Sequence, residues 1–251
     1  MRVLVVSDLH GNLAALEAVL AGAPAHDALW CLGDLVDYGP EPNQCIARLL
    51  ELGARCVVGN HDRASVDGWT DRQLSAGSRA ALSALPADLR VGEVTLRHGV
   101  AEGLRPPAAS DLADLEGQLL LVGHTHLPLL YRHDERGESR WLGPPVGEPI
   151  PLRRERAIAN PGSVGLSFLD PGRASALLYD TARRELTWLA ASYPIDGVLD
   201  RLRGAGAPAP LLAGQRAYVA GELEPMRRVR AEHEAWSRLN SVCAAPPAAG
   251  S

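Results

Sequence analysis

The chain contains no lysine, so all 25 of its basic side chains are arginines. Aromatic residues are scarce, and Phe168 is the single phenylalanine. Alanine, glycine and proline are abundant instead, a composition typical of a GC-rich coding sequence, so we give arginine clusters no functional weight. The formal net charge of -5 does not favour nucleic acid or an anionic membrane as a partner.

Long apolar runs are also missing. No stretch is long enough to span a bilayer, and Asp8 interrupts the first apolar segment before a signal peptide could form. We therefore expect a cytoplasmic protein without a membrane partner. The few cysteines show no C-x-x-C spacing; Cys31, Cys45 and Cys56 lie in apolar segments, which predicts reduced thiols in the core.

The apolar pattern predicts an α/β fold. Strands at residues 2–6, 28–32 and 55–58 alternate with helices at 13–20 and 42 to about 52, an order typical of a parallel sheet with right-handed crossovers. Residues 63–85 are predicted to form a loop and a helix, a candidate lid over the site. Two further strands, at 94–97 and 119–122, each end at a histidine.

The second half predicts another, more antiparallel sheet. Its expected strands lie at residues 129–132, 140–142, 156–159, 174–179 and 186–190, and helices follow at 196–203, about 210–220 and 224–239. We expect a catalytic domain over residues 1–195, a helical extension over 196–240 and a disordered tail over 241–251. The natural packing is a sandwich of two sheets flanked by helices.

Five short polar motifs each follow an apolar run that resembles a buried strand. They are S-D-L-H-G-N at residues 7–12, G-D-L-V-D at 33–37, G-N-H-D at 59–62, H-G at 98–99 and G-H-T-H at 123–126. In open α/β sheets, ligands bind beyond the carboxyl ends of the strands. The motifs therefore predict one site containing two aspartates, one asparagine and four histidines.

The spacing within the motifs favours metal binding. Asp8 and His10 are separated by one residue, as are His124 and His126, so in extended backbone both side chains of each pair point to the same side. Asp34 follows a glycine that permits a sharp turn, and its two carboxylate oxygens can bridge two ions. Such a set of oxygen and imidazole ligands suits two adjacent divalent metals.

Paired metals offer a route to the hydrolysis of phosphate esters. Two cations about 4 Å apart can hold a hydroxide between them, lower its pKa and neutralise charge while it attacks phosphorus in line. His61 follows Asn60, whose carbonyl oxygen is a ligand for a hard cation, and is placed to protonate the leaving alkoxide. We expect Asp37 to hold that imidazole protonated and oriented.

The five motifs, in this order, resemble the pattern of the calcineurin-like metallophosphoesterase superfamily over roughly residues 1–165. The S-D-L-H-G-N motif and N-P-G-S-V-G at 160–165 are similar to its small prokaryotic phosphodiesterase-like branch. The resemblance implies a four-layered α/β/β/α sandwich of two mixed sheets, with a C-terminal helical extension. It implies two divalent metals, with manganese preferred to iron, zinc, nickel or cobalt.

The resemblance also assigns roles to residues. His61 is implied as the general acid or hydrogen-bond donor to the transition state, with Asp37 as its partner. Asn12 is either the cap of the following helix or a contact to substrate. The implied metal ligands are Asp8, His10 and His126 for the first ion, Asp34 as the bridge, and Asn60, His98 and His124 for the second.

One departure from the family pattern bears on the substrate. Tyr38 follows G-D-L-V-D, where related protein phosphatases and diadenosine tetraphosphatases have an arginine that binds phosphate. Tyrosine cannot offer that cationic fork, which favours phosphodiesters, nucleotide or nucleic-acid derived, because they carry one charge fewer. A phosphomonoesterase acting on nucleotides or proteins, a non-catalytic scaffold and a partner-dependent nucleic-acid-processing subunit remain alternatives. The sequence is compatible with a monomer or a homodimer.

Overall fold

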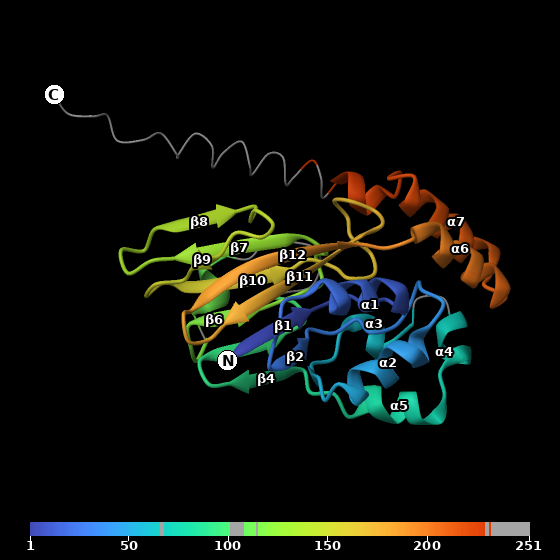
Figure 1. Ribbon diagram of the computed structural model, residues 1–251, viewed down its shortest axis with the longest axis horizontal. Helices are drawn as coiled ribbons and strands as arrows, with labels where there is room; N and C mark the ends of the chain where they lie inside the picture. The colour runs from blue at the N-terminus through green and yellow to red at the C-terminus, as the bar shows by residue number, and fades with distance from the viewer. Residues whose placement is uncertain (66–67, 101–107, 114, 229–230, 232–251) are drawn as a thin grey trace.

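A computed structural model describes residues 1–65, 68–100, 108–113, 115–228 and 231. Two six-stranded mixed sheets form its centre. Figure 1 shows the strands on the left and most of the helices on the right of the molecule. Within the described residues, no helix is both long and apolar enough to cross a membrane.

The first sheet is built around the N-terminal strand. β1 (Arg2–Val6) pairs in parallel with β2 (Ala28–Cys31), and β2 with β3 (Arg55–Cys56). α1 (Leu13–Gly22) and α2 (Pro42–Glu51) connect these strands, so the predicted parallel βαβ units are confirmed. On the other side of β1 the sheet continues, antiparallel, through β11 (Arg173–Asp180), β12 (Glu185–Ser192) and β9 (Ile150–Pro151).

The second sheet contains both parallel and antiparallel pairs. Its strands, in spatial order, are β4 (Asp88–Val91), β5 (Val94–Arg97), β6 (Leu119–Leu121), β10 (Arg156–Pro161), β7 (Pro128–His133) and β8 (Ser139–Leu142). β5, β6 and β10 run parallel, which brings the histidines after β5 and β6 to the same edge.

The prediction that residues 174–179 and 186–190 belong to the second sheet is wrong. They form β11 and β12, which extend the first sheet beside β1. Alternation of apolar residues locates a strand, but its partner is chosen by contacts distant in the sequence. Here β11 pairs with β1 along Arg2 to Val5, and no local sequence pattern indicates this pairing.

The core explains why these layers form. Val3 and Val5 of β1 point into the space between the sheets, where they pack with Trp30 and Trp188. Leu4 and Val6 point the other way, into the cluster made with α1 and α2. β1 is therefore buried on both faces, as its unbroken apolar run predicts.

Helices cover the two outer faces unequally. α1 and α2 cover the first sheet, whereas on the second sheet Leu120, Tyr131 and Ile158 pack with Leu112 of the 3-10 helix η1 (Ala109–Leu112). The predicted two mixed sheets flanked by helices are confirmed, and in the described part of the chain η1 represents the fourth layer.

The described residues 63–65 and 68–85 do not form the expected lid. They include the end of α3 (Asn60–Arg63), α4 (Trp69–Gln73) and α5 (Ala76–Ser83), and the last two pack against α2. Trp69 and Leu82 are buried in the same apolar cluster as α1 and α2. The burial of these two apolar side chains holds α4 and α5 against the core, so these helices do not extend over the predicted site.

Of the two C-terminal helices, the second, at residues 209–219, borders the predicted site. α6 (Ile195–Gly204) and α7 (Ala209–Val219) match the two helices predicted at 196–203 and 210–220. Val198, Leu202 and Leu211 join the apolar cluster of the first sheet. Residues 224–228 are helical; the rest of the helix predicted at 224–239, and the tail at 241–251, lie almost wholly outside the described residues.

The cysteines agree with their prediction where they are described. Cys31 and Cys45 are free and buried, and Cys56 is free and half-buried. Burial raises the pKa of the Cys45 thiol well above its usual value. Cys243 lies outside the described residues.

Candidate metal centre

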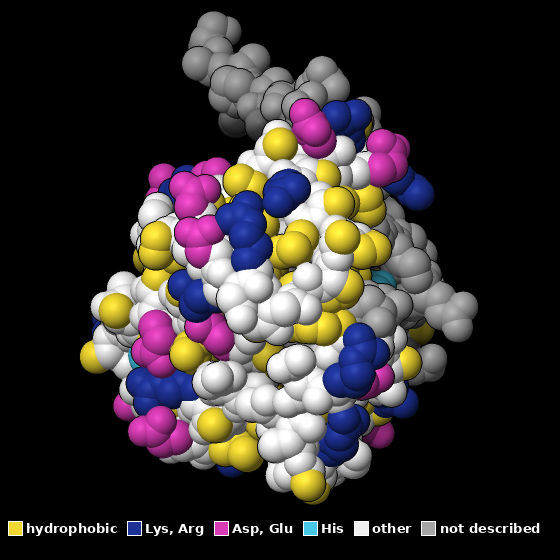
Figure 2. Space-filling view, turned by 90° about the vertical axis from the view of Figure 1, so that its right-hand side faces the viewer, with side chains coloured by type: hydrophobic (Ala, Val, Ile, Leu, Met, Phe, Trp, Pro, Cys, Tyr) yellow, Lys and Arg dark blue, Asp and Glu magenta, His cyan; other side chains and the backbone are white. Residues whose placement is uncertain are grey.

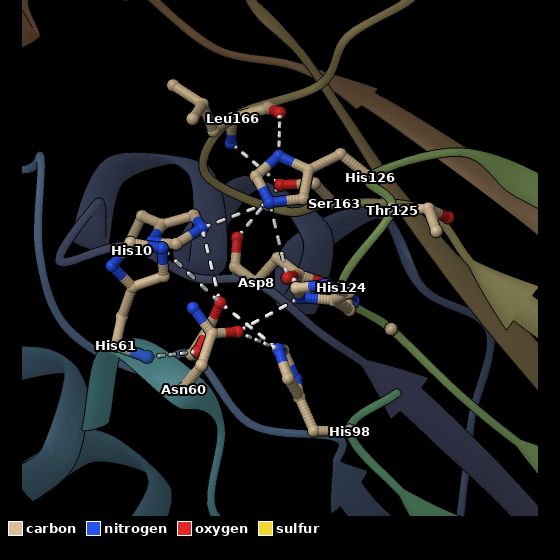
Figure 3. A network of polar contacts seen from close by, with 12 residues as sticks. Asp8, His10, Asn60, His61, His98, His124, Thr125, His126, Ser163 and Leu166 are labelled. Carbon is tan, nitrogen blue, oxygen red and sulfur yellow. Dashed lines mark hydrogen bonds and ion pairs between the residues drawn. The ribbon is translucent and has the colours of Figure 1, made fainter. Parts of the chain in front are cut away.

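The predicted motifs meet beyond the carboxyl ends of the parallel strands. Backbone hydrogen bonds tie their loops together: the Asp8 N–H donates to the Gly33 carbonyl at 3.0 Å, and the Gly123 N–H to that of His98 at 2.8 Å. Figure 3 shows side chains from the motifs turned toward one another. All seven predicted ligands converge here: Asp8, His10, Asp34, Asn60, His98, His124 and His126.

Most of these residues adopt left-handed backbone, which few non-glycine residues do. The values of φ are 54° at Asp8, 48° at His10, 54° at Asp34, 68° at His124 and 59° at His126. The extended backbone predicted for the two alternating pairs is therefore wrong, and tight turns aim these side chains instead. Such conformations cost on the order of 1 kcal/mol each and cluster at functional sites.

The first group of ligands consists of Asp8, His10, Asp34 and His126, whose ligand atoms all lie within 4.8 Å of one another. Nε2 of His10 is 3.2 Å from Nε2 of His126, which is 3.3 Å from Oδ1 of Asp8. All four side chains are buried. The group is therefore a compact, buried cluster of two carboxylates and two imidazoles.

Backbone carbonyls fix both imidazoles of this group. Nδ1 of His10 donates to the Val36 carbonyl at 3.0 Å, and Nδ1 of His126 to the Leu166 carbonyl at 2.7 Å. Because a carbonyl oxygen can only accept, Nδ1 of each ring carries a proton and Nε2 is the nitrogen turned inward. Burial, reinforced by His126, lowers the pKa of His10 to about 4, so its ring is neutral near pH 7.

The two inward nitrogens lie 3.2 Å apart, close enough for one cation to be shared between them. Carboxylate oxygens lie beside them, with Oδ1 of Asp8 3.3 Å from Nε2 of His126 and Oδ2 of Asp34 3.9 Å from Nε2 of His10. Imidazole nitrogens with carboxylate oxygens are the donors that divalent transition metals take in proteins. The residues present therefore fit a metal ion.

The second group combines Asp34, Asn60, His98 and His124. Oδ1 of Asn60 lies 3.0 Å from Nε2 of His98 and 3.0 Å from Nδ1 of His124, while Oδ2 of Asp34 is 3.1 Å from that same Nε2. Asp34 belongs to both groups. Its carboxylate is thus positioned between two sets of ligands, as a bridge between two ions requires.

Charge is balanced in this group by histidine. Burial, the largest influence, lowers the pKa of His98, but its hydrogen bond to Asp34 and the charge on Asp8 raise it to about 9. Burial likewise favours a raised pKa at Asp34, but the hydrogen bond and charge of His98 hold it below its usual range. The site therefore keeps its carboxylates ionised, which is the state that binds metal.

The predicted acid and its partner are also in contact. Nδ1 of His61 lies 2.8 Å from Oδ2 of Asp37, and Ser65 Oγ donates to Oδ1 of Asp37 at 2.7 Å. The other ring nitrogen, Nε2 of His61, is 4.0 Å from Oδ2 of Asp34. Burial lowers the pKa of His61, but the hydrogen bond to Asp37 and the charge on Asp34 outweigh it and leave the pKa raised.

Two supporting residues were not assigned a role from the sequence. Asp62, the third residue of α3, accepts hydrogen bonds from the backbone N–H groups of Asp34, Gly59 and Leu35 at 2.8–2.9 Å. Its place three residues after Gly59, as in a capping box, was the available signal. Asp62 therefore holds the Asp34 loop against the loop that carries Asn60.

The second is Ser163, within the N-P-G-S-V-G motif. Its hydroxyl donates to the Asp8 carbonyl at 2.9 Å and accepts from the Leu166 N–H at 2.8 Å. The Gly165 N–H donates to the same Asp8 carbonyl at 2.9 Å. This turn thus supports the backbone of Asp8. It also positions the Leu166 carbonyl, which accepts the hydrogen bond from Nδ1 of His126.

Asn12 caps α1. Its Oδ1 accepts from the Ala15 N–H at 3.1 Å and its Nδ2 donates to the Gly165 carbonyl at 3.2 Å. The side chain is 3% exposed and does not line the cleft described below. Because both amide atoms are engaged by backbone, we assign Asn12 to capping, and its predicted contact with substrate has no geometric support.

A cleft of about 440 Å³ opens over the metal centre. Asp34, His61, His124 and His126 form its floor, and its wall is made by Phe168 and one face of α7. Tyr38, the residue at which the sequence departs from the family pattern, also lines this cleft. No arginine is among the described residues that line it, so histidine supplies the only ionisable nitrogen there.

Comparison with known proteins agrees with this geometry. Residues 1–159 match the family model of the calcineurin-like phosphoesterases. The chain belongs to this family. A crystal structure of a metallophosphoesterase from Sphaerobacter thermophilus has a TM-score of 0.77 and 34% sequence identity, covering 87% of this chain and 100% of that one. The protein is accordingly a hydrolase of phosphate esters, from a family that uses divalent metals.

Two sequence relatives differ in how much they cover. An uncharacterised protein of Methanocaldococcus jannaschii is 28% identical over 227 residues, 80% of this phosphoesterase and 91% of that protein. A symmetrical bis(5'-nucleosyl)-tetraphosphatase of Pectobacterium carotovorum is 43% identical over only 67 residues, 25% of this chain and 24% of that enzyme. The second match therefore concerns a quarter of each chain.

Replacing Asp62 with asparagine is expected to destabilise this phosphoesterase by about 2–3 kcal/mol, because the amide nitrogen cannot accept and leaves backbone N–H groups unpaired. Denaturant unfolding of the metal-free protein measures the change. Asp71→Asn, at an exposed position of α4, is the matched control and is expected to leave the free energy of unfolding unchanged. Equal stability of both variants would contradict the supporting role of Asp62.

Proposed function

We propose that this protein is a phosphodiesterase that works with two divalent metal ions, one held by Asp8, His10 and His126 and the other by Asn60, His98 and His124. Asp34 would bridge them. The observation that carries the proposal is the approach of Nε2 of His10 to Nε2 of His126, 3.2 Å apart, in a cluster that shares Asp34 with a second ligand group. When bound, such ions supply activated water and neutralise charge on the phosphoryl oxygens.

The protein's own residues supply the proton. His61 lies on the cleft floor with Nδ1 held by Asp37, which orients the ring and raises its pKa, so the doubly protonated ring can give the proton on Nε2 to the leaving group. Ser65 holds Asp37 in turn, through its hydroxyl. The dyad therefore protonates the departing alkoxide, or donates a hydrogen bond to it in the transition state.

The charge of the cleft supports a diester as substrate. A phosphomonoester carries about one negative charge more than a diester, and enzymes that cleave monoesters often pair it with an arginine. Here Tyr38 stands in that position, and no arginine lines the described cleft. The mixed oxygen and imidazole ligands suit any of the candidate metals, manganese, iron, zinc, nickel or cobalt, and manganese is the first one to test.

Model substrates test this proposal directly. With manganese added, we expect kcat/KM for bis(p-nitrophenyl) phosphate to exceed that for p-nitrophenyl phosphate by about tenfold or more, the equivalent of about 1.4 kcal/mol for one uncompensated charge. Protein stripped with a chelator is expected to be inactive and to recover when manganese is returned.

Other outcomes of the same assay would overturn the proposal. Turnover of the monoester alone would identify a phosphomonoesterase. Absence of turnover with either substrate, although the protein binds metal, would indicate a non-catalytic scaffold or a subunit that requires a partner.

A further inference from the structure

One face of α7 borders the cleft over the metal centre. Leu211, Gly214, Gln215 and Tyr218 all line it, at the spacing of three and four residues that places side chains on one side of a helix. Figure 2 shows hydrophobic side chains gathered on the upper part of the face that carries α6 and α7. The helix therefore presents an uncharged surface to whatever is attached to the phosphate.

Gly214 keeps this part of the cleft open. It lies inside α7, where glycine costs about 1 kcal/mol relative to alanine. A Cβ atom built on Gly214 meets nothing within 4 Å, so packing of the protein does not require the missing side chain. The space in front of this glycine belongs to the cleft.

Aromatic rings connect this face to the metal ligands. The ring of Phe168 lies 4.4 Å from that of His126, centroid to centroid, with 33° between their planes. The ring of Tyr38 lies 5.0 Å from that of His61. Both aromatic residues line the cleft, so a group bound between Phe168 and α7 is directly beside the reacting phosphate.

One polar group stands out on this surface. The side chain of Gln215 is 7% exposed and makes no hydrogen bond within the described part of the chain, although it lines the cleft. Its amide atoms are not among the fully buried polar atoms of the described chain, so they face the cleft and are free to pair with a bound group. A ligand with a hydrogen-bonding edge would supply a partner.

We propose that the face of α7 around Gly214 is a subsite for an uncharged planar ring with a hydrogen-bonding edge, attached to the phosphate of the substrate. A nucleobase has this chemistry, and a phenyl ring has the planar part of it. The inference rests on the proposed function, because the metal centre must hold the phosphate for the ring to reach α7. It adds the substrate class: a ring-bearing ester rather than a polyphosphate or a small alkyl ester.

Three phosphonates that cannot be hydrolysed test the subsite by binding alone. They are ethylphosphonate, 2-phenylethylphosphonate and 2-(adenin-9-yl)ethylphosphonate, which share a head group and linker but carry no ring, an apolar ring and a ring with a polar edge. Calorimetry on the full-length, manganese-loaded protein gives each Kd. We expect both ring compounds to bind at least about tenfold more tightly than ethylphosphonate, since a ring buries enough apolar surface for that gain.

Two variants locate the effect. In Gly214→Phe the new side chain fills the cleft, and the tenfold advantage of both rings is expected to fall to about twofold or less, with ethylphosphonate unchanged. Gly204→Phe is the matched control: Gly204 ends α6, its Cβ position is also open and it does not line the cleft. Gln215→Leu is expected to weaken the adenine compound alone, by about fivefold.

The results separate this inference from the function on which it rests. Equal Kd values for all three phosphonates in the wild type, or an undiminished ring advantage in Gly214→Phe, would overturn the subsite and leave the metal centre intact. Because a phosphonate carries the charge of a monoester, failure of every phosphonate to bind is read together with the assay of model substrates. Turnover of bis(p-nitrophenyl) phosphate without binding of any phosphonate would overturn the subsite alone, and absence of both would overturn the proposed function as well. Weakening of the phenyl compound by Gln215→Leu to the same extent as the adenine compound would overturn the hydrogen-bonding edge.

Discussion

Exchange of Asp34 for asparagine is expected to lower kcat by about a thousandfold or more, since paired metals contribute several kcal/mol to the stabilisation of the transition state. Oδ1 of Asp34 accepts the His61 N–H at 2.9 Å, and an asparagine oxygen can keep that bond. Oδ2, which lies 3.1 Å from Nε2 of His98 and 3.9 Å from Nε2 of His10, would become an NH₂ group. The variant therefore keeps the fold but loses the atom shared by both ligand groups.

Measurements of metal content and stability distinguish a lost metal bridge from an unfolded protein as the cause of the lower kcat. We expect the wild type to retain two manganese ions after gel filtration and Asp34→Asn to retain fewer, while the thermal unfolding of the variant without metal changes by only a few degrees. Asp71→Asn, exposed on α4, serves as the control and should match the wild type in metal content and kcat. Full metal content in an inactive Asp34→Asn would contradict the bridging role.

The sequence predicted the fold where the chain is locally consistent. The run from Arg2 to Val6 is apolar and β-branched, and it forms a strand with the predicted bounds. The Asn12 cap and Pro42 mark the starts of α1 and α2 as the rules for helix termini require. What failed was the assignment of β11 and β12 to a sheet, because Leu177 and Trp188 read as apolar strand residues in either sheet.

The candidate site was predictable because its residues are concentrated in short motifs. Their convergence follows from the parallel strands, whose carboxyl ends meet at one edge. The extended backbone that was predicted to orient the side chains of Asp8 and His10 was nevertheless wrong. Their backbone is left-handed, and its conformation is imposed by hydrogen bonds from other loops, such as the one from the Asp8 N–H to the Gly33 carbonyl.

The wall of the cleft could not be read from the sequence. Leu211, Gly214 and Tyr218 carry no motif, and their helical spacing is that of any helix packed on a core. Only the tertiary position of α7 turns one of its faces toward His126 and Phe168. Residues that bind variable parts of a substrate are determined by such placement rather than by local pattern. The sequence alone therefore predicted a lid at residues 63–85 and not at α7.

The second large effect is expected at His61. His61→Ala should lower kcat by about 10²- to 10⁴-fold for an alkoxide leaving group, the range typical of a lost general acid. The backbone N–H of His61 still donates to Asp34 in this variant, so manganese content is expected to stay at the level of the wild type. The loss would therefore lie in proton transfer and not in the metal centre.

A series of diesters with different leaving groups makes this prediction specific. A nitrophenolate leaves without a proton, so its hydrolysis should suffer far less from His61→Ala than that of an alkyl or nucleoside ester. Asp37→Asn should show the same dependence to a smaller extent, because Nδ1 of His61 would lose its anionic partner at 2.8 Å. His26→Ala, on the loop before β2, is the control. An equal loss for all leaving groups would identify His61 as a hydrogen-bond donor to the phosphoryl oxygens, whereas loss of manganese would place its role in metal binding.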